Sequence, residues 1–388
     1  MKCLRCGNED PHFFFGVGQK KYCRKCVSFR RIYVDETPTS TVEKTEDIDA
    51  SYHLPFELTA YQNELSKRIL ATVLEQKNVL IRAVCGAGKT ELVYETISYY
   101  LNTGKKVCFA IARRQVVLEL AKRFEKVFTS LKVIAVCEGH TKVINGDLIV
   151  CTTHQLYRYY RFFDLLILDE PDAFPFAGNE VLMNIACNSC RGEIIYLSAT
   201  PDEYLLRLVN KGALVRFDLP LRPSNLPLPL PKVYYLPNLL IFVFLLLWLS
   251  QKKKQGRQGL IFAPTIALVN KIVIMIKSYY RVDGITSKTS EKEKVIERYR
   301  KKELQFLVCT TVLERGVTFE GIDVLVLLSQ HAVFNTSALI QIIGRVGRGI
   351  KDTSGEATLL STSKTTSIDQ CIESTHLDNQ LAFGVIKK

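Results

Sequence analysis

The sequence lacks an apolar run long enough to cross a bilayer, and it has few acidic residues relative to its basic ones. Its one apolar block, 239–249, would reach only about 17 Å as a helix, against a hydrocarbon core of roughly 30 Å. A block this short predicts a helix buried in a domain, with contact to a membrane face or a partner as the alternative. Lys and Arg number 52 against 39 Asp and Glu, and the net charge of +13 predicts an anionic partner, either nucleic acid or a membrane surface.

Signals of export are also missing. The first residues carry no apolar signal region, and twelve cysteines in 388 residues do not make a disulfide scaffold. Both observations predict a reducing, cytoplasmic setting, with a peripheral position at the inner face of the cell membrane as an open alternative. The length predicts two or three domains.

Two cysteine pairs stand at the N-terminus, where Cys3-x2-Cys6 is followed after sixteen residues by Cys23-x2-Cys26. Four thiolates at this spacing predict a closed tetrahedral zinc site, and therefore a structural one. The basic and aromatic residues between and after the pairs either contact a nucleic-acid strand or only fill and solvate the module. A third pair, Cys187-x2-Cys190, has no mate, and a structural role is the simpler interpretation.

A glycine-rich segment follows an apolar run, 78–84, that has the length and composition of a buried strand, and a helical pattern comes after it. Strand, glycine loop and helix in this order predict a P-loop that holds the phosphates of ATP. Lys89 would reach the β- and γ-phosphates and the Thr90 hydroxyl would hold Mg²⁺, while Ala83 replaces the first glycine of the common pattern. The predicted phosphate-binding residues are Gly86, Ala87, Gly88, Lys89 and Thr90.

A second apolar strand, 162–172, ends in acidic residues. Asp169 would bind Mg²⁺ and Glu170 would orient and polarise the attacking water, whereas the simpler alternative is a pair of solvated carboxylates. Ahead of the P-loop, Gln62 is a weaker candidate for reading the adenine edge, since a glutamine at a helix start is common.

Six segments occur in the order found in superfamily 2 helicases and translocases, and the chain resembles that superfamily over roughly residues 54–388. The four-cysteine module, the acidic linker and "DEPDAFPF" together resemble the ComFA family, helicase-like ATPases of bacterial competence implicated in bringing incoming single-stranded DNA into the cytosol. The six segments are "AVCGAGKTEL", "LDEPD", "LSAT", "LIFAPT", "TTVLERGVTFEGID" and "QIIGRVGR".

Short apolar strands alternate with helical patterns in both halves of the chain, which predicts an α/β fold with parallel sheets covered on both faces. The resemblance implies two RecA-like parallel-sheet domains in tandem, preceded by the small zinc-binding module. The predicted parts are the four-cysteine zinc module (1–32), an acidic flexible linker (33–53), RecA-like domain 1 (54–218), a proline-rich linker (219–237) and RecA-like domain 2 (238–388).

Three residues near the C-terminus, Gln341, Arg345 and Arg348, stand at spacings of four and three, so on a helix they would share one face. The resemblance implies that Arg345 and Arg348 reach the γ-phosphate, one of them as an arginine finger. By the same resemblance, the candidates for strand contact are Arg113, Thr152, Thr153, Thr265, Thr310 and Thr311, although each threonine could equally be a strand-end cap. The candidates for coupling hydrolysis to strand movement are Ser198, Thr200, Arg315 and Gly316.

The resulting prediction is an ATP-dependent single-stranded DNA translocase or helicase that drives DNA uptake, with ATP, Mg²⁺ and a structural Zn²⁺. A membrane DNA-uptake channel and companion competence proteins are partners by resemblance. An RNA helicase, a replication-restart-type DNA helicase and a non-hydrolysing, ATP-gated nucleic-acid clamp are the alternatives. The N-terminal place of the cysteine module disfavours a restart helicase, and the complete set of ATPase residues disfavours a clamp.

Overall fold

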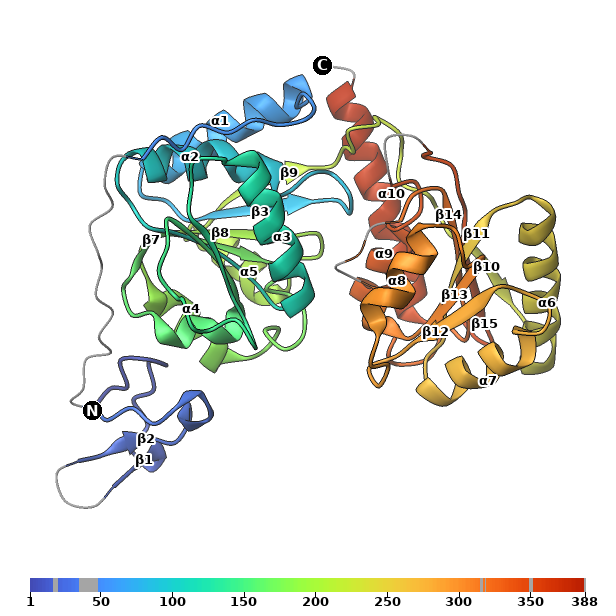
Figure 1. Cartoon of the computed structure of the whole chain (residues 1–388), viewed down its shortest axis with the longest axis horizontal. Helices are drawn as coiled ribbons and strands as arrows, with labels where there is room; N and C mark the ends of the chain where they lie inside the picture. Colours follow the sequence, from blue (N-terminus) through green and yellow to red (C-terminus); the bar gives the residue numbers. More distant parts are fainter. Residues whose placement is uncertain (17–19, 35–47, 315–316, 318, 349–351, 387–388) are drawn as a thin grey trace. The chain divides into compact units, whose positions relative to one another are not determined.

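The computed structural model describes residues 1–16, 20–34, 48–314, 317, 319–348 and 352–386 (Figure 1). Its contacts divide the chain into two compact units. The first unit comprises Met1–Ala83 and Gly88–Leu219, and the second comprises Val84–Ala87 and Pro220–Lys388. Arg315 and Gly316, two of the predicted coupling residues, lie outside the described residues.

The first unit is built on a seven-stranded sheet in the order β5-β6-β4-β7-β8-β3-β9, and every neighbouring pair is parallel. The strands are β3 (Val79–Ala83), β4 (Val107–Ile111), β5 (Val133–Val136), β6 (Leu148–Thr152), β7 (Phe163–Asp169), β8 (Cys190–Ser198) and β9 (Val215–Leu219). Its helices are α1 (Ala60–Leu74), α2 (Tyr94–Asn102), α3 (Arg114–Val127), α4 (Glu180–Ser189) and α5 (Glu203–Asn210), with the 3₁₀ turns η3 (Glu91–Val93) and η4 (Thr153–Arg158). The central strands β4 and β6 are buried along their whole length, as expected for a parallel sheet covered on both faces.

The N-terminal module belongs to the first unit and is held together by short elements. They are η1 (Pro11–Phe13), β1 (Phe14–Phe15), β2 (Tyr22–Cys23) and η2 (Val27–Phe29), with β1 and β2 paired antiparallel. The four cysteines and Ile32 share one buried cluster with residues of the large sheet and its helices, so the module packs on this unit.

The second unit contains a six-stranded sheet in the order β10-β15-β14-β11-β13-β12, again with every pair parallel. The strands are β10 (Lys232–Tyr235), β11 (Gln258–Phe262), β12 (Val282–Ile285), β13 (Phe306–Cys309), β14 (Ile322–Val326) and β15 (Ala357–Ser361). The helices are α6 (Asn238–Lys254), α7 (Ile266–Ile276), α8 (Lys292–Arg300), α9 (Thr336–Ile343) and α10 (Thr366–Ile386), with η5 (Thr311–Leu313). The predicted fold class, two parallel-sheet α/β domains after a cysteine-rich module, is confirmed.

Two segments differ from their interpretation in the sequence. Lys232–Tyr235, assigned to the proline-rich linker, forms β10 at the edge of the second sheet, where Pro231 precedes the strand and removes no ladder hydrogen bond from it. The block 239–249 is helical as predicted, but it is buried on one side only: Leu245 is inside, whereas Leu239 and Leu247 are 77% and 66% exposed. No helix within the described residues is long and apolar enough to cross a membrane.

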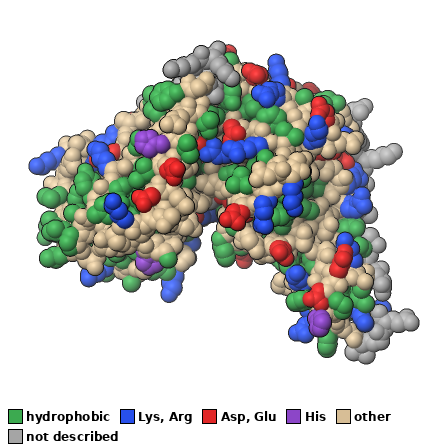
Figure 2. All heavy atoms as spheres, turned by 180° about the vertical axis from the view of Figure 1, so that it is seen from behind, with side chains coloured by type: hydrophobic (Ala, Val, Ile, Leu, Met, Phe, Trp, Pro, Cys, Tyr) green, Lys and Arg blue, Asp and Glu red, His purple; other side chains and the backbone are tan. Residues whose placement is uncertain are grey.

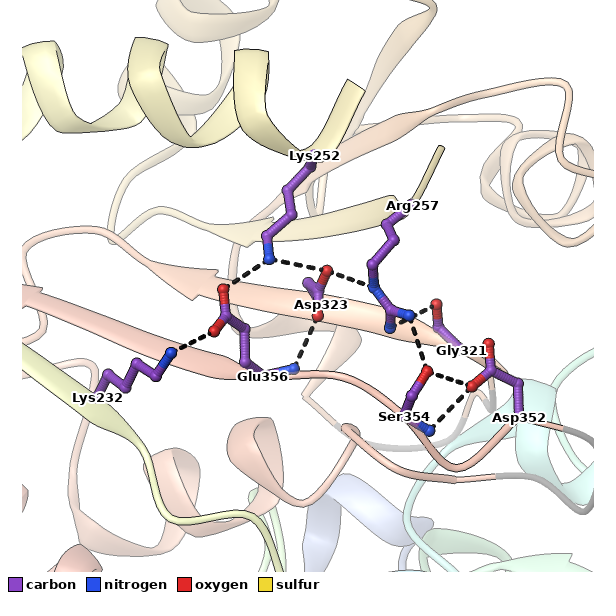
Figure 3. Close-up of polar contacts among 8 residues, drawn as sticks. All are labelled: Lys232, Lys252, Arg257, Gly321, Asp323, Asp352, Ser354 and Glu356. Carbon is purple, nitrogen blue, oxygen red and sulfur yellow. Dashed lines mark hydrogen bonds and ion pairs between the residues drawn. The ribbon is translucent and has the colours of Figure 1, made fainter. Parts of the chain in front are cut away.

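A buried ionic network ties five elements of the second unit together at the amino ends of its strands (Figure 3). Asp323, 1% exposed, is the ion-pair partner of Arg257 at 2.7 Å and of Lys252 at 3.1 Å, and it accepts the Glu356 backbone N–H at 2.7 Å. Glu356 pairs in turn with Lys252 at 2.6 Å and Lys232 at 2.7 Å. Burial alone would raise the pKa of Glu356, but the two lysines outweigh it and lower the pKa. The network therefore joins β10, α6 and the loops before β11 and β15 to β14.

Candidate functional site

The predicted residues of the first unit gather at one edge of its sheet. Lys89 lies beyond the end of β3, Arg113 follows β4, Thr152 ends β6, Asp169 ends β7 and Ser198 ends β8. These strands are all parallel, so their carboxyl ends lie along the same edge. Ligand sites of open parallel α/β sheets form at that edge, and the sequence segments separated by about a hundred residues are brought together there.

Lys89 and Asp169 form an ion pair at the centre of this edge. The Lys89 Nζ lies 3.4 Å from Oδ1 of Asp169, and the two side chains are only 15% and 13% exposed. Burial raises the pKa of Asp169 to about 6; the charge of Lys89 opposes this rise and the charge of Glu170 adds to it. A further cation next to this buried carboxylate would stabilise its charged form.

Asp169 also fits the predicted Mg²⁺ ligand by its hydrogen bonding. Its Oδ1 is buried and accepts no hydrogen bond from a described residue, the Lys89 ammonium at 3.4 Å being its charged neighbour. Carboxylate oxygens are ligands that Mg²⁺ prefers. Thr90 and Asp169 would hold the ion, and the ion would neutralise charge on the phosphates during hydrolysis.

Glu170, the predicted water-orienting residue, has an unusual backbone. Its φ of 55° lies in the left-handed region, which costs energy for a residue with a side chain. The Glu170 N–H donates to the Leu197 carbonyl of β8 at 2.9 Å, and the Glu170 carbonyl accepts from Ala173 at 3.0 Å. The surrounding hydrogen bonds thus hold this residue in a conformation that a relaxed strand end would not adopt.

Gln62 packs against the glycine loop. It completes a capping box at the start of α1, where its N–H donates to Thr59 Oγ1 at 3.2 Å and its Oε1 accepts the Thr59 N–H at 3.0 Å. Gly88 has φ +86°, and a Cβ on it would come within 2.9 Å of the Gln62 Nε2. The positive φ is what favours glycine at this position, because the Gln62 amide ends a flexible side chain that could move away from a Cβ. The role of Gln62 in reading adenine stays a prediction.

Asp172 is a site residue that the sequence reasoning missed. One oxygen of its carboxylate accepts from the Ser198 hydroxyl at 2.5 Å and the other accepts from the Thr200 hydroxyl at 2.9 Å. The bonds join the acidic segment after β7 to the "SAT" segment after β8, so the predicted coupling residues Ser198 and Thr200 touch the catalytic segment directly. The third acid of "DEPD" was the available signal, but only the first two acids received a role.

The predicted arginines of the second unit are placed differently from expectation. Helix α9 ends at Ile343, so the prediction that Gln341, Arg345 and Arg348 share a helical face is wrong. Gly344 caps the helix and Gly347, with φ +70°, turns the chain away from a helical path. Gln341 is buried, and its Nε2 finds no partner among the described residues.

The two arginines also differ from each other. Arg345 is 1% exposed, and its Nη1 donates to the Val317 carbonyl. Arg348 is half-buried, and its Nε donates to the Gly344 carbonyl at 2.7 Å. Arg348 is therefore the more accessible of the two candidate fingers within its own unit.

Arg222, which lies in the proline-rich stretch, holds this arginine-bearing turn in place. It is 4% exposed, and its guanidinium donates to the carbonyls of Val346 at 2.7 Å, Gly344 at 2.8 Å and Gly347 at 3.1 Å. Burial, and then the charge of Arg348, lower the pKa of Arg222 to about 10, so it is still charged at neutral pH. An arginine isolated between prolines in an apolar stretch was the only sequence signal for it.

Arg222→Ala is expected to lower the ATP turnover number at least roughly tenfold. The variant lacks the guanidinium that binds the backbone carbonyls of the turn that carries Arg345 and Arg348, so this turn is no longer held in position. Thermal unfolding should show a loss of about 2–4 kcal/mol from the unsatisfied buried groups. Arg216→Ala is the matched control, since Arg216 is paired with Asp218 in the first unit. A turnover number for Arg222→Ala equal to that of the control would show that Arg222 is not needed to position the turn.

The predicted strand-contact residues are not equally accessible. Thr152 and Thr153 are buried, and the Thr153 hydroxyl has no hydrogen-bond partner among the described residues. Thr265 is exposed, but its hydroxyl accepts the Leu268 N–H at 3.2 Å and so caps α7. Arg113, Thr310 and Thr311 are half-buried. Their contacts with a strand stay predictions.

The four N-terminal cysteines form a sulfur cage that fits zinc. All four sulfurs lie within 4.8 Å of one another, with Cys3 to Cys26 and Cys6 to Cys23 each at 3.7 Å. A tetrahedral zinc with bonds of about 2.3 Å requires sulfur separations of roughly 3.8 Å. The residues are buried, so the cage has the closed form of a structural site.

Residues 55–203 match the family described as type III restriction enzyme, res subunit, and residues 235–349 match the helicase conserved C-terminal domain. Competence protein ComFA of Streptococcus pneumoniae is 33% identical over 396 residues, which cover 98% of this chain and 90% of that protein. Competence protein ComFA of Bacillus subtilis is 32% identical over 402 residues, covering 99% and 87%. The solved structure of S. cerevisiae Dbp5 bound to RNA and ADP BeF3 matches with a TM-score of 0.62 at 17% identity, covering 81% of this chain and 87% of that one.

The likeness to Dbp5 bears on the fold alone, because the identity is low. The helicase families and the full-length relatives identify an ATP-hydrolysing enzyme of the helicase type, as the sequence predicted. Identity of about a third, maintained over nearly the whole chain and including the four-cysteine module, decides the family. This chain belongs to the ComFA family of competence proteins.

Proposed function

We propose that this helicase-type ATPase is a translocase on single-stranded DNA that drives DNA uptake during competence. The observation that carries the proposal is the assembly at the carboxyl edge of the first sheet. There the buried pair of Lys89 and Asp169 stands next to Glu170, and Asp172 links that acidic segment to Ser198. Such an assembly can hydrolyse ATP and pass the change to a neighbouring segment. The competence role comes from the names of the ComFA relatives.

The chain's own residues divide the proposed chemistry. Lys89 stabilises charge on the β- and γ-phosphates, and Glu170 orients the water that attacks the γ-phosphate. Arg348, more accessible than Arg345, is our first choice for the residue that stabilises negative charge in the transition state. Asp172 senses the state of the acidic segment and transmits it through Ser198 and Thr200.

The nucleic acid is gripped without regard to sequence. The basic excess of the chain and the hydroxyl and guanidinium groups predicted for strand contact suit phosphates, which carry no sequence information. RNA is the second candidate track, because contacts to phosphates do not by themselves separate DNA from RNA. An uptake channel and companion competence proteins are part of the proposal through the family alone.

The test compares steady-state ATP hydrolysis by the full chain with no polymer, with single-stranded DNA, with duplex DNA and with RNA. Single-stranded DNA should stimulate turnover most, by about tenfold or more, because catalysis is coupled to movement along the strand. If RNA alone stimulates ATP turnover, the track of the translocase is RNA and not single-stranded DNA. Equal turnover in all four reactions would rule out a translocase.

A further inference from the structure

Six basic side chains of the N-terminal module lie outside the ion pairs that its described acidic residues form. They are all exposed, and none forms an ion pair with a described residue. The two acidic residues in this part of the module are already engaged, Glu9 with Lys2 at 2.9 Å and Asp10 with His12 at 3.0 Å. The six are Lys20, Lys21, Arg24, Lys25, Arg30 and Arg31.

Aromatic rings alternate with these charges in space. Arg24 lies 5.5 Å from the centre of the Phe15 ring, and Arg31 lies 4.6 Å from that of Tyr22. Phe15 and Tyr22 themselves contact edge to face, with ring centres 6.2 Å apart. Two further pairs, Lys25 over Phe13 at 5.7 Å and Lys20 over Tyr33 at 6.0 Å, extend the pattern.

The rings that form this pattern are not core residues. Phe15 is 57% exposed and Phe13 is 39% exposed, although burying them would stabilise an isolated module. Figure 2 shows basic side chains among hydrophobic ones on the module. Four of the six cations, Lys20, Arg24, Lys25 and Arg31, each lie against a ring, and these contacts restrain their charges before any ligand binds. We call the six basic residues with Phe13, Phe15, Tyr22 and Tyr33 the basic-aromatic face.

The module is fixed to the first unit through η4, the turn that directly follows β6. Phe29 stacks on His154 with ring centres 6.0 Å apart, and Arg5 lies 5.7 Å from the Tyr157 ring centre. Asn188 of α4 donates to the Arg5 carbonyl at 3.0 Å. The module that carries the basic-aromatic face therefore packs on the unit that contains the ATPase edge, against the turn that begins directly after Thr152.

We propose that the basic-aromatic face binds single-stranded nucleic acid, its cations contacting phosphates and its rings stacking on bases. The proposal rests on the function proposed above and adds a second grip on the same strand. Unpaired positive charge with interleaved exposed rings is the composition of surfaces that hold unstacked strands. In a duplex the bases stack on one another, so they could not stack on the aromatic rings of this face.

The test uses the triple variant Arg24→Ala/Lys25→Ala/Arg31→Ala in the full chain, with fluorescence anisotropy on labelled oligothymidylate across a salt series. The matched control removes three exposed lysines that each have an acidic partner, Lys77→Ala/Lys294→Ala/Lys301→Ala, so both variants lose the same charge. Zinc content and ATP turnover without polymer show that both variants are folded.

The triple variant should bind at least about tenfold more weakly than the control. Its slope of log affinity against log salt should be less steep by about 2, since each lost phosphate contact contributes roughly 0.7 on single strands. Phe15→Ala should weaken binding without changing that slope, because stacking releases no counterions.

If the triple variant and the control bind oligothymidylate with equal affinity and equal salt dependence, the proposal is wrong. A protein partner would then be the alternative ligand of the basic-aromatic face. The two proposals fail differently. A wild-type chain whose turnover ignores every polymer contradicts the translocase, whereas normal stimulation with an unchanged affinity in the triple variant contradicts only the second grip.

Discussion

Lys89→Ala is expected to abolish ATP hydrolysis, lowering the turnover number by about a thousandfold or more, since one charge-stabilising group is typically worth 10²–10³ and Lys89 also binds the ground state. The substitution has a second effect through Asp169. Burial already raises the pKa of Asp169 to about 6, and Lys89 is the charge that opposes the rise. Without Lys89 the pKa rises further, so more of the carboxyl is protonated at neutral pH and less is able to bind Mg²⁺.

The measurement is ATP turnover with single-stranded DNA at several Mg²⁺ concentrations and at pH 6, 7 and 8. Part of the lost Mg²⁺ affinity should return as pH increases, because deprotonation of Asp169 then becomes easier. Lys77→Ala serves as the control, since Lys77 is exposed and its ion-pair partner among the described residues is Glu75. Residual turnover in Lys89→Ala close to the control value would mean that the glycine loop is not the hydrolysis site.

Cys3→Ser/Cys6→Ser should reduce the zinc content from about one ion per chain to none. Binding of structural zinc is worth about 10–16 kcal/mol in small modules at neutral pH, and this module has few other buried residues. The loss should spread beyond the module, because its cysteines and Ile32 share a buried cluster with the sheet of the first unit. Limited proteolysis should then cut the N-terminal 32 residues rapidly.

The control for zinc loss is Cys187→Ser/Cys190→Ser, which changes the third Cys-x2-Cys pair, the one that has no mate. It should keep the full zinc content and the protease resistance of the module. Zinc retained in Cys3→Ser/Cys6→Ser, or lost from the control, would contradict the assignment of the four N-terminal sulfurs.

Sequence periodicity predicted most of the fold because the central strands are apolar throughout. The runs that became β3, β4, β6, β7 and β8 are buried and bounded by polar turns. The strands that were missed lie at sheet edges. β12, "VDGI", is short and half-polar, and β10 follows a run of prolines; the neighbouring strand in the sheet makes each of them a strand.

The candidate site was predictable wherever the chemistry depends on spacing along the chain. Lys89 and Asp169 follow predicted strands, and a parallel sheet brings such positions together without further information. Arg222 could not be found in this way, because three of its carbonyl partners lie more than 120 residues later and a fourth, Cys85, lies 137 residues earlier. The helical face predicted for Arg345 and Arg348 failed because Gly344 ends α9 before Arg345, and Gly347 turns the chain between the two arginines.

The ionic network of the second unit has a consequence for where that unit can be shortened. The match to the helicase C-terminal family ends at residue 349, but β15 lies between β14 and β10 in the sheet and carries the neighbouring Glu356 into the network. A polypeptide trimmed at the family boundary would leave Lys252 and Asp323 buried without Glu356. It would also expose the edge of β14 and leave β10 without its neighbouring strand. Aggregation of such a fragment would then result from the missing strand and would not be a property of the full-length enzyme.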